Sequence, residues 1–186
     1  MTNDTRFWHP FADMGAVRGS EFVIDRGEDV WIWDSEGNRY LDATASLWYA
    51  NVGHGRPEIA AAVADQLAKI EAYSAFGDFS CASTLELAEI LADRAPMPSR
   101  VFFTSGGGDS IDAATKLARR YWFELDQPDR TVLISRTQGY HGTHGYGTAL
   151  GGIPANRVGY GPQVETEQVP HDSVEALEAA ISRIGA

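Results

Sequence analysis

The sequence has 186 residues, a formal net charge of −11 and 44% hydrophobic residues, which is enough for one ordinary domain or a domain with a small lobe. The acidic balance and the scattered basic residues argue against nucleic acid or a membrane surface as the main partner, and no apolar run approaches the roughly 20 residues that span a bilayer. The one cysteine, Cys81, excludes an internal disulfide and fits a reducing cytosol, so we expect a cytoplasmic protein.

The first fifty residues read as an irregular arm followed by short strands. Residues 21–25 and 30–34 alternate in the manner of a hairpin, with Gly27 in the connecting turn. A second turn at residues 35–38 leads into a further short strand at residues 40–42.

Two helices are predicted next. Pro57 suits the first position of a helix whose apolar residues recur on one face. Ser83 and Glu86 have the spacing of a capping box at the start of the second helix.

The stretch from residue 100 to residue 135 predicts a strand–helix–strand unit. An apolar strand at residues 100–104 precedes a helix at 109–126, and a second apolar strand follows at 131–135. Continuous apolar strands around a helix are typical of an α/β fold with a mostly parallel sheet covered on both faces. Another strand at 165–169 and a last helix, capped by Asp172 and Glu175, complete the pattern.

Three consecutive glycines lie between the predicted strand and helix, in the segment Ser-Gly-Gly-Gly-Asp-Ser at residues 105–110. Glycine lets an anion approach the backbone, and the first turn of a helix offers unpaired N–H groups and a positive dipole end. The segment therefore predicts a phosphate cradle, although a tight turn alone would also use glycine. A Walker loop would need a lysine at the helix start, and a dinucleotide fingerprint would need glycine where Ile111 stands, so both nucleotide readings are weakened.

The loop after the second strand of this unit carries Gly-Tyr-His-Gly at residues 139–142. Because loops after parallel strands share one rim of the sheet, Tyr140 should face the same cleft as the glycine turn and could stack on a flat ring. A purely packing role for Tyr140 stays open. His141 and His144 lack the further ligands that a zinc site needs, so we expect no metal.

Several segments together resemble a known family. VFFTSGGGDSIDAATKLARRYW resembles the V-F-F-x-N-S-G-S-E-A-N-D-x-A-x-K-L-A-R segment of class III aminotransferases, and GYHG resembles the motif of their ring-stacking tyrosine. YLDATASLWYANVGHGRPEI and the N-terminal WHPF are similar to further segments of the same group. The resemblance covers nearly the whole chain and implies a fold-type-I enzyme that depends on pyridoxal 5'-phosphate.

The resemblance also assigns roles to residues of this chain. It implies that the cofactor is bound by Gly106, Gly107, Gly108, Asp109, Tyr140 and His141, and that Trp48 lines the substrate pocket. Two departures stand out: Gly108 replaces a family serine and loses its hydroxyl, and Asp109 replaces a glutamate. Backbone donors survive both changes, and the Ser110 hydroxyl could compensate for the lost one.

The same resemblance predicts the organisation and the reaction. Residues 1–55 would form an N-terminal arm and part of the small domain, and residues 56–186 the first part of the cofactor-binding large domain. The family's Schiff-base lysine lies further along than the matched region, and Lys69 and Lys116 read as solvated helix lysines, so we expect an N-terminal fragment of a homodimeric transaminase. The reaction would move an amino group from an amine or amino acid to a keto or aldehyde acceptor. Two alternatives remain: an inactive fragment that binds the cofactor or phosphate, and a nucleotide-binding α/β module.

Overall fold

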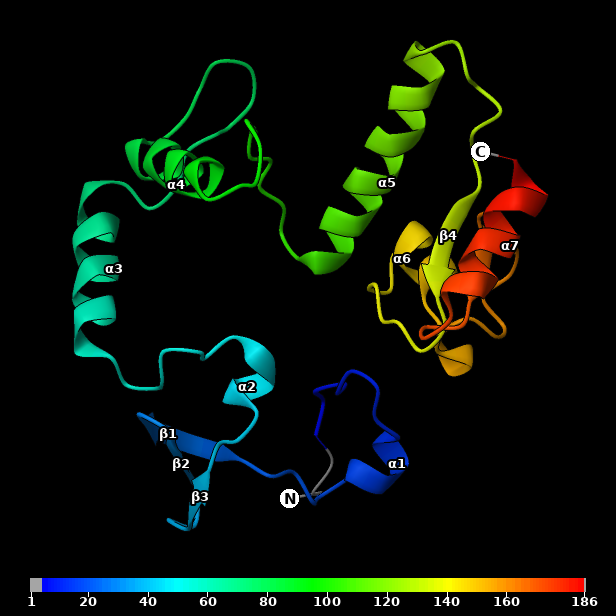
Figure 1. Cartoon of the computed structure of the whole chain (residues 1–186). Coiled ribbons are helices and arrows are strands. Elements are labelled where there is room, and N and C mark those ends of the chain that lie inside the picture. Colours follow the sequence, from blue (N-terminus) through cyan, green and yellow to red (C-terminus); the bar gives the residue numbers. More distant parts are fainter. Residues whose placement is uncertain (1–4, 186) are drawn as a thin grey trace. The chain divides into compact units, whose positions relative to one another are not determined.

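The computed structural model describes residues 5–185 of the chain, which divide into two compact units, Met1–Leu85 and Glu86–Ala186 (Figure 1). The predicted domain boundary after residue 55 concerns the complete protein and stays a prediction. None of the helices in residues 5–185 combines the length and apolar character needed to cross a membrane.

A three-stranded antiparallel sheet organises the first unit after the short helix α1 (Met14–Val17). Its strands, β1 (Ile24–Glu28), β2 (Trp31–Asp34) and β3 (Arg39–Leu41), follow one another in space as in sequence. The predicted hairpin is present, but Gly27 was wrongly placed in its turn. Gly27 lies within β1 opposite Ile32, and Asp29, with φ +52°, begins the turn instead.

The turn between β2 and β3 is organised by the carboxylate of Asp34. It accepts hydrogen bonds from the backbone N–H groups of Glu36 and Asn38, from the Asn38 side chain and from the Tyr40 hydroxyl, at 2.8–3.0 Å. These donors, with the Asn38 side chain first, lower the pKa of Asp34 to about 2. An ionised carboxylate therefore holds this turn at neutral pH.

Three helical segments follow the sheet. The segment labelled α2 (Ala45–Trp48) is a left-handed turn, and α3 (Pro57–Lys69) begins with Pro57 at its first position, as predicted. Helix α4 (Ala82–Asp93) runs across the boundary between the units. The predicted capping box was wrong, because Ser83 is already inside α4 and the first turn bonds to the carbonyl of Cys81.

The second unit places helices around a pair of parallel strands. It contains α5 (Gly107–Glu124), β4 (Leu133–Arg136), α6 (Gly145–Leu150), the 3₁₀ turn η1 (Pro154–Asn156), β5 (Thr166–Val169) and α7 (Val174–Ile184). Strands β4 and β5 pair in parallel, with Leu133 opposite Thr166. The α/β character is thus as predicted. The strand expected at residues 100–104 is absent, because no described strand lies beside residues 101–104 to pair with them.

The buried apolar side chains of residues 5–185 all lie in this second unit: they are Ala149, Val169 and Ala180. They come from α6, β5 and α7, so the small core forms where these elements meet. Helix α7 is capped by the Ser173 hydroxyl, which accepts from the Ala176 N–H at 3.1 Å. The predicted cap at Asp172 was therefore one residue too early.

Candidate cofactor and substrate site

The first turn of α5 offers backbone N–H groups to a ligand. Gly106 precedes the helix in extended conformation, and the first intrahelical bond runs from the Ser110 N–H to the Gly106 carbonyl at 3.0 Å. The N–H groups of Gly107, Gly108 and Asp109 lie ahead of that bond, where a helix has no acceptor for them. A Cβ on Gly107 would meet no protein atom within 4 Å, so space for an anion is open there.

Two hydroxyls brace the carbonyl at the start of this helix. The oxygens of Thr104 and Ser110 each lie 3.1 Å from the Gly106 carbonyl oxygen and contact each other. They fix the orientation of the peptide unit that joins Gly106 to Gly107 and therefore carries the first open N–H. Whether Ser110 also replaces the lost hydroxyl at Gly108 stays a prediction.

The loop that carries Tyr140 and His141 meets the glycine turn through two glycines. A Cβ on Gly142, where φ is +93°, would lie 2.7 Å from the Gly108 Cα. Such a distance is shorter than carbon atoms tolerate, so this approach requires glycine at position 142. The structure thus brings the tyrosine loop beside the start of α5.

The aromatic side chains of this loop differ in their exposure and in their contacts. Tyr140 is 53% exposed, and the His141 ring covers Gly139, where a Cβ would lie 2.8 Å from Nε2. His144 Nδ1 lies 3.5 Å from Asp109 Oδ1 and forms an ion pair with it when protonated. The loop therefore has a second, electrostatic link to the first turn of α5.

A third link, which sequence reasoning missed, comes from Asp112. Its Oδ1 accepts from the N–H groups of Tyr146 and Gly147, each at 3.1 Å, and so caps the start of α6 from the neighbouring helix. The available signal was that His144, just before α6, supplies no capping side chain of its own.

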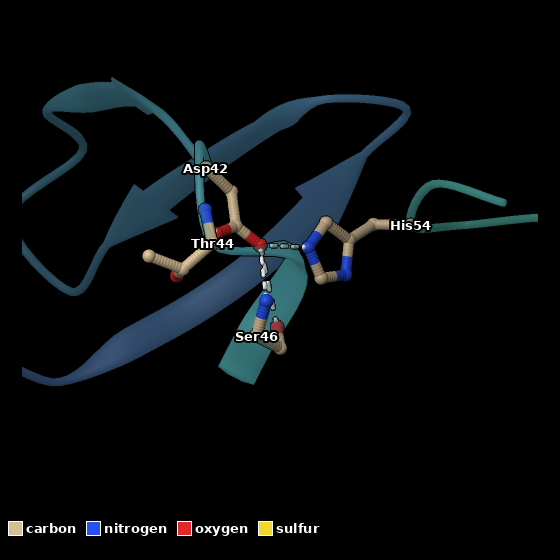
Figure 2. A network of polar contacts seen from close by, with 4 residues as sticks. All are labelled: Asp42, Thr44, Ser46 and His54. Atoms are coloured by element: carbon tan, nitrogen blue, oxygen red, sulfur yellow. Dashed lines mark hydrogen bonds and ion pairs between the residues drawn. The ribbon is translucent and has the colours of Figure 1, made fainter. Parts of the chain in front are cut away.

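Trp48 belongs to the first unit. It ends the left-handed turn α2, and its side chain is 73% exposed. Figure 2 shows the polar network beside this turn, in which His54 Nε2 and Asp42 Oδ2 lie 2.8 Å apart. The sequence gave no sign that Asp42 and His54 meet.

Comparisons with known proteins identify the lineage. The family model "Aminotransferase class-III" matches residues 14–175. The chain is 42% identical to the putrescine–pyruvate aminotransferase of Pseudomonas aeruginosa over 149 residues, which cover 78% of this chain and 32% of that enzyme. It is 36% identical to the β-alanine–pyruvate aminotransferase of the same organism, covering 88% of this chain and 37% of that one.

Solved structures agree with this relation. A transaminase from the marine bacterium Virgibacillus superposes with a TM-score of 0.91 at 35% identity, over 97% of this chain and 43% of that one. An amine transaminase from an uncultivated Pseudomonas species, in its PLP-bound form, gives a TM-score of 0.91 at 31% identity, over 100% of this chain and 47% of its own. The chain thus spans about a third of the curated relatives and less than half of the solved ones, with the incomplete fold-type-I architecture expected from the sequence. It belongs to the class-III aminotransferase family.

Proposed function

We propose that the protein carrying these residues is a pyridoxal-phosphate-dependent transaminase, which moves an amino group from an amine or amino acid to a keto or aldehyde acceptor. The observation that carries this proposal is the start of α5, where open N–H groups lie beside the loop of Tyr140 and His141. Family membership supports pyridoxal phosphate as the anion, because a solved relative is in its PLP-bound form.

The residues divide the work of holding the cofactor. The N–H groups of Gly107, Gly108 and Asp109 would bind the phosphate, aided by the positive end of the α5 dipole. Tyr140 would stack on the cofactor ring, and His141 would keep its loop against Gly139. When bound, pyridoxal phosphate supplies the electron sink that lets an amine lose its α-proton.

The substrates follow from the relatives' names. Both P. aeruginosa relatives use pyruvate as acceptor, and we propose pyruvate here, with a small amine donor that contacts Trp48. A homodimer is also proposed, supported by the exposure of large apolar side chains such as Phe102 at 76%. The cytoplasmic location is proposed on the single cysteine alone.

Amino transfer is tested with the protein expressed from its complete gene. Incubated with pyridoxal phosphate, pyruvate and either putrescine or β-alanine, it should form alanine, measured by chromatography. A related donor panel should show one preferred class. A protein that binds pyridoxal phosphate but forms no alanine with any donor would contradict the proposed reaction.

The phosphate cradle is tested at Gly107. Proline is tolerated at the first helical position but has no N–H, so Gly107→Pro removes one donor and keeps the helix. Because a hydrogen bond to a charged group contributes about 1.5–3 kcal/mol, we expect the Kd for pyridoxal phosphate to rise by roughly tenfold or more. Gly107→Ala keeps the N–H and is the matched control.

Pyridoxal without phosphate completes this test. Its Kd should not differ between Gly107→Pro and Gly107→Ala, since the missing donor would have served the phosphate. Equal losses of pyridoxal phosphate affinity in the two variants would show that this N–H is not a ligand.

A further inference from the structure

Four consecutive residues other than glycine adopt a left-handed backbone in turn α2. Their φ values are +47° at Ala45, +50° at Ser46, +65° at Leu47 and +78° at Trp48. L-amino acids avoid this region, because their Cβ crowds the following carbonyl oxygen. A run of four such residues persists only where the surrounding structure holds it.

The Asp42 carboxylate is the group that holds this turn. Its Oδ2 accepts from the Ser46 N–H at 2.8 Å, and its Oδ1 accepts from the N–H and the hydroxyl of Thr44 at 3.2 and 3.1 Å (Figure 2). The Asp42 side chain is 6% exposed. Hydrogen bonding, with His54 as the main cause, lowers the pKa of Asp42 to about 2, so the acceptor stays ionised at neutral pH.

His54 connects that carboxylate to the hairpin. Its Nε2 lies 2.8 Å from Asp42 Oδ2 and donates to the ionised oxygen. Its backbone exchanges two hydrogen bonds with Asp29 at the β1–β2 turn, at 2.8 and 2.9 Å. A Cβ on Gly27 would lie 2.7 Å from the His54 Cβ, so the histidine side chain packs directly against strand β1.

The turn that these contacts hold presents large apolar side chains outward. The exposed fractions are 68% for Leu47, 73% for Trp48 and 81% for Tyr49. The Trp48 N–H closes the turn by donating to the Thr44 carbonyl at 2.8 Å. Because the direction of a side chain follows its backbone, a turn of the opposite hand would aim the Trp48 indole elsewhere.

We propose that Asp42 and His54 act as a pair of positioning residues, which hold the left-handed turn so that the Trp48 indole faces the amine substrate. The inference rests on the proposed transaminase function. It adds that the direction of the Trp48 indole is set by a hydrogen-bonded carboxylate–imidazole pair anchored on the hairpin.

Kinetics of the complete protein test the coupling to Trp48. Asp42→Asn and His54→Gln should each raise the KM for the amine donor by about tenfold and change kcat less than about threefold, because they disturb binding rather than the reaction. Thr44→Val, which removes one hydroxyl from Asp42 but spares the Ser46 and His54 bonds, is the matched control and should change KM by less than about twofold.

A double-mutant cycle separates positioning from general destabilisation. If the pair acts through the indole, Asp42→Asn should add less than about twofold to KM in a Trp48→Ala background. Fully multiplicative effects would overturn the proposal. Replacing Ser46 with glycine should restore much of the KM of Asp42→Asn, because glycine adopts positive φ without the steric cost.

A spectroscopic measurement tests the proposal without turnover. In protein labelled with 5-fluorotryptophan, the Trp48 resonance is assigned by its loss in Trp48→Phe. It should shift in Asp42→Asn and His54→Gln, stay in place in Thr44→Val, and return in Asp42→Asn with Ser46→Gly. An unmoved resonance in both pair variants would refute the positioning role, whereas absent alanine formation alone would refute only the proposed reaction.

Discussion

The two units of the chain are stabilised by different means. Among the described residues, the first unit buries the Asp34 carboxylate and no apolar side chain, whereas the second buries Ala149, Val169 and Ala180 between its strands and helices. In the first unit ionised carboxylates fix the backbone at two turns. In the second, apolar packing and a glycine–glycine approach fix it together with one capping carboxylate, Asp112, so the two units should respond to different kinds of substitution.

The largest expected effect is at the glycine–glycine approach of the second unit. Gly142→Ala places a Cβ 2.7 Å from the Gly108 Cα at a backbone φ of +93°, and overpacking with a strained φ costs about 3 kcal/mol. We expect the tyrosine loop to move from the start of α5 and the Kd for pyridoxal phosphate to rise more than about tenfold.

Gly37→Ala is the control for the backbone strain alone. Gly37 has φ +87° in the first unit, and a Cβ there meets nothing within 4 Å. Measured by cofactor titration, it should leave the Kd unchanged. Similar losses in both variants would mean that the close approach to Gly108 is not what holds the loop.

Local pattern sufficed for much of this fold. Helix α5 and strands β4 and β5 were predicted within two residues of their observed ends. For α5 and β4 the signal, an apolar helix face and an apolar run, is contained in the segment itself. The strand predicted at residues 100–104 is not observed, since a strand forms only by pairing with another strand. The contacts at the site were not predicted for the same reason, because each joins residues that are distant in the sequence. Asp112 bonds to Gly147, 35 positions away, and Asp42 bonds to His54, 12 positions away.

The apolar core of the second unit gives the next effect. Val169 is 5% exposed at the end of β5, and its truncation to alanine should destabilise the unit by about 2 kcal/mol through the cavity it leaves. Hydrogen exchange of the complete protein should therefore speed up in β4 and β5, while the amides of β1–β3 stay unchanged.

Val174 offers the matched control for this truncation. It lies at the start of α7 and is 67% exposed, so Val174→Ala should change stability by less than about 0.5 kcal/mol. If Val169→Ala sped up hydrogen exchange in β1–β3 as much as in β4 and β5, the two units would share one core. That result would contradict the claim that they are stabilised separately.

The smallest effect is the acid response of the first unit. Asp34 and Asp42 have pKa values near 2 in the folded chain, below the ordinary value of 3.8. Between these values the unfolded chain binds more protons than the folded one, so the stabilisation is complete above about pH 4 and is lost as pH falls toward 2. Protection of the β2–β3 amides, corrected for intrinsic exchange rates, should fall over this window.

Asn in place of Asp34 sharpens this test, because the amide keeps the size of the side chain and cannot titrate. Asp34→Asn should lower the protection of the β2–β3 turn at pH 6 and flatten its dependence on pH. Glu36→Gln removes a carboxylate in the same turn. Because Glu36 bonds to Asp34 only through its backbone N–H, this substitution should leave both the protection at pH 6 and its pH dependence unchanged. If the wild type and Asp34→Asn lost protection in parallel from pH 4 to pH 2, the turn would be held by something other than the Asp34 charge, and the contrast between a carboxylate-held unit and an apolar one would fail at its clearest point.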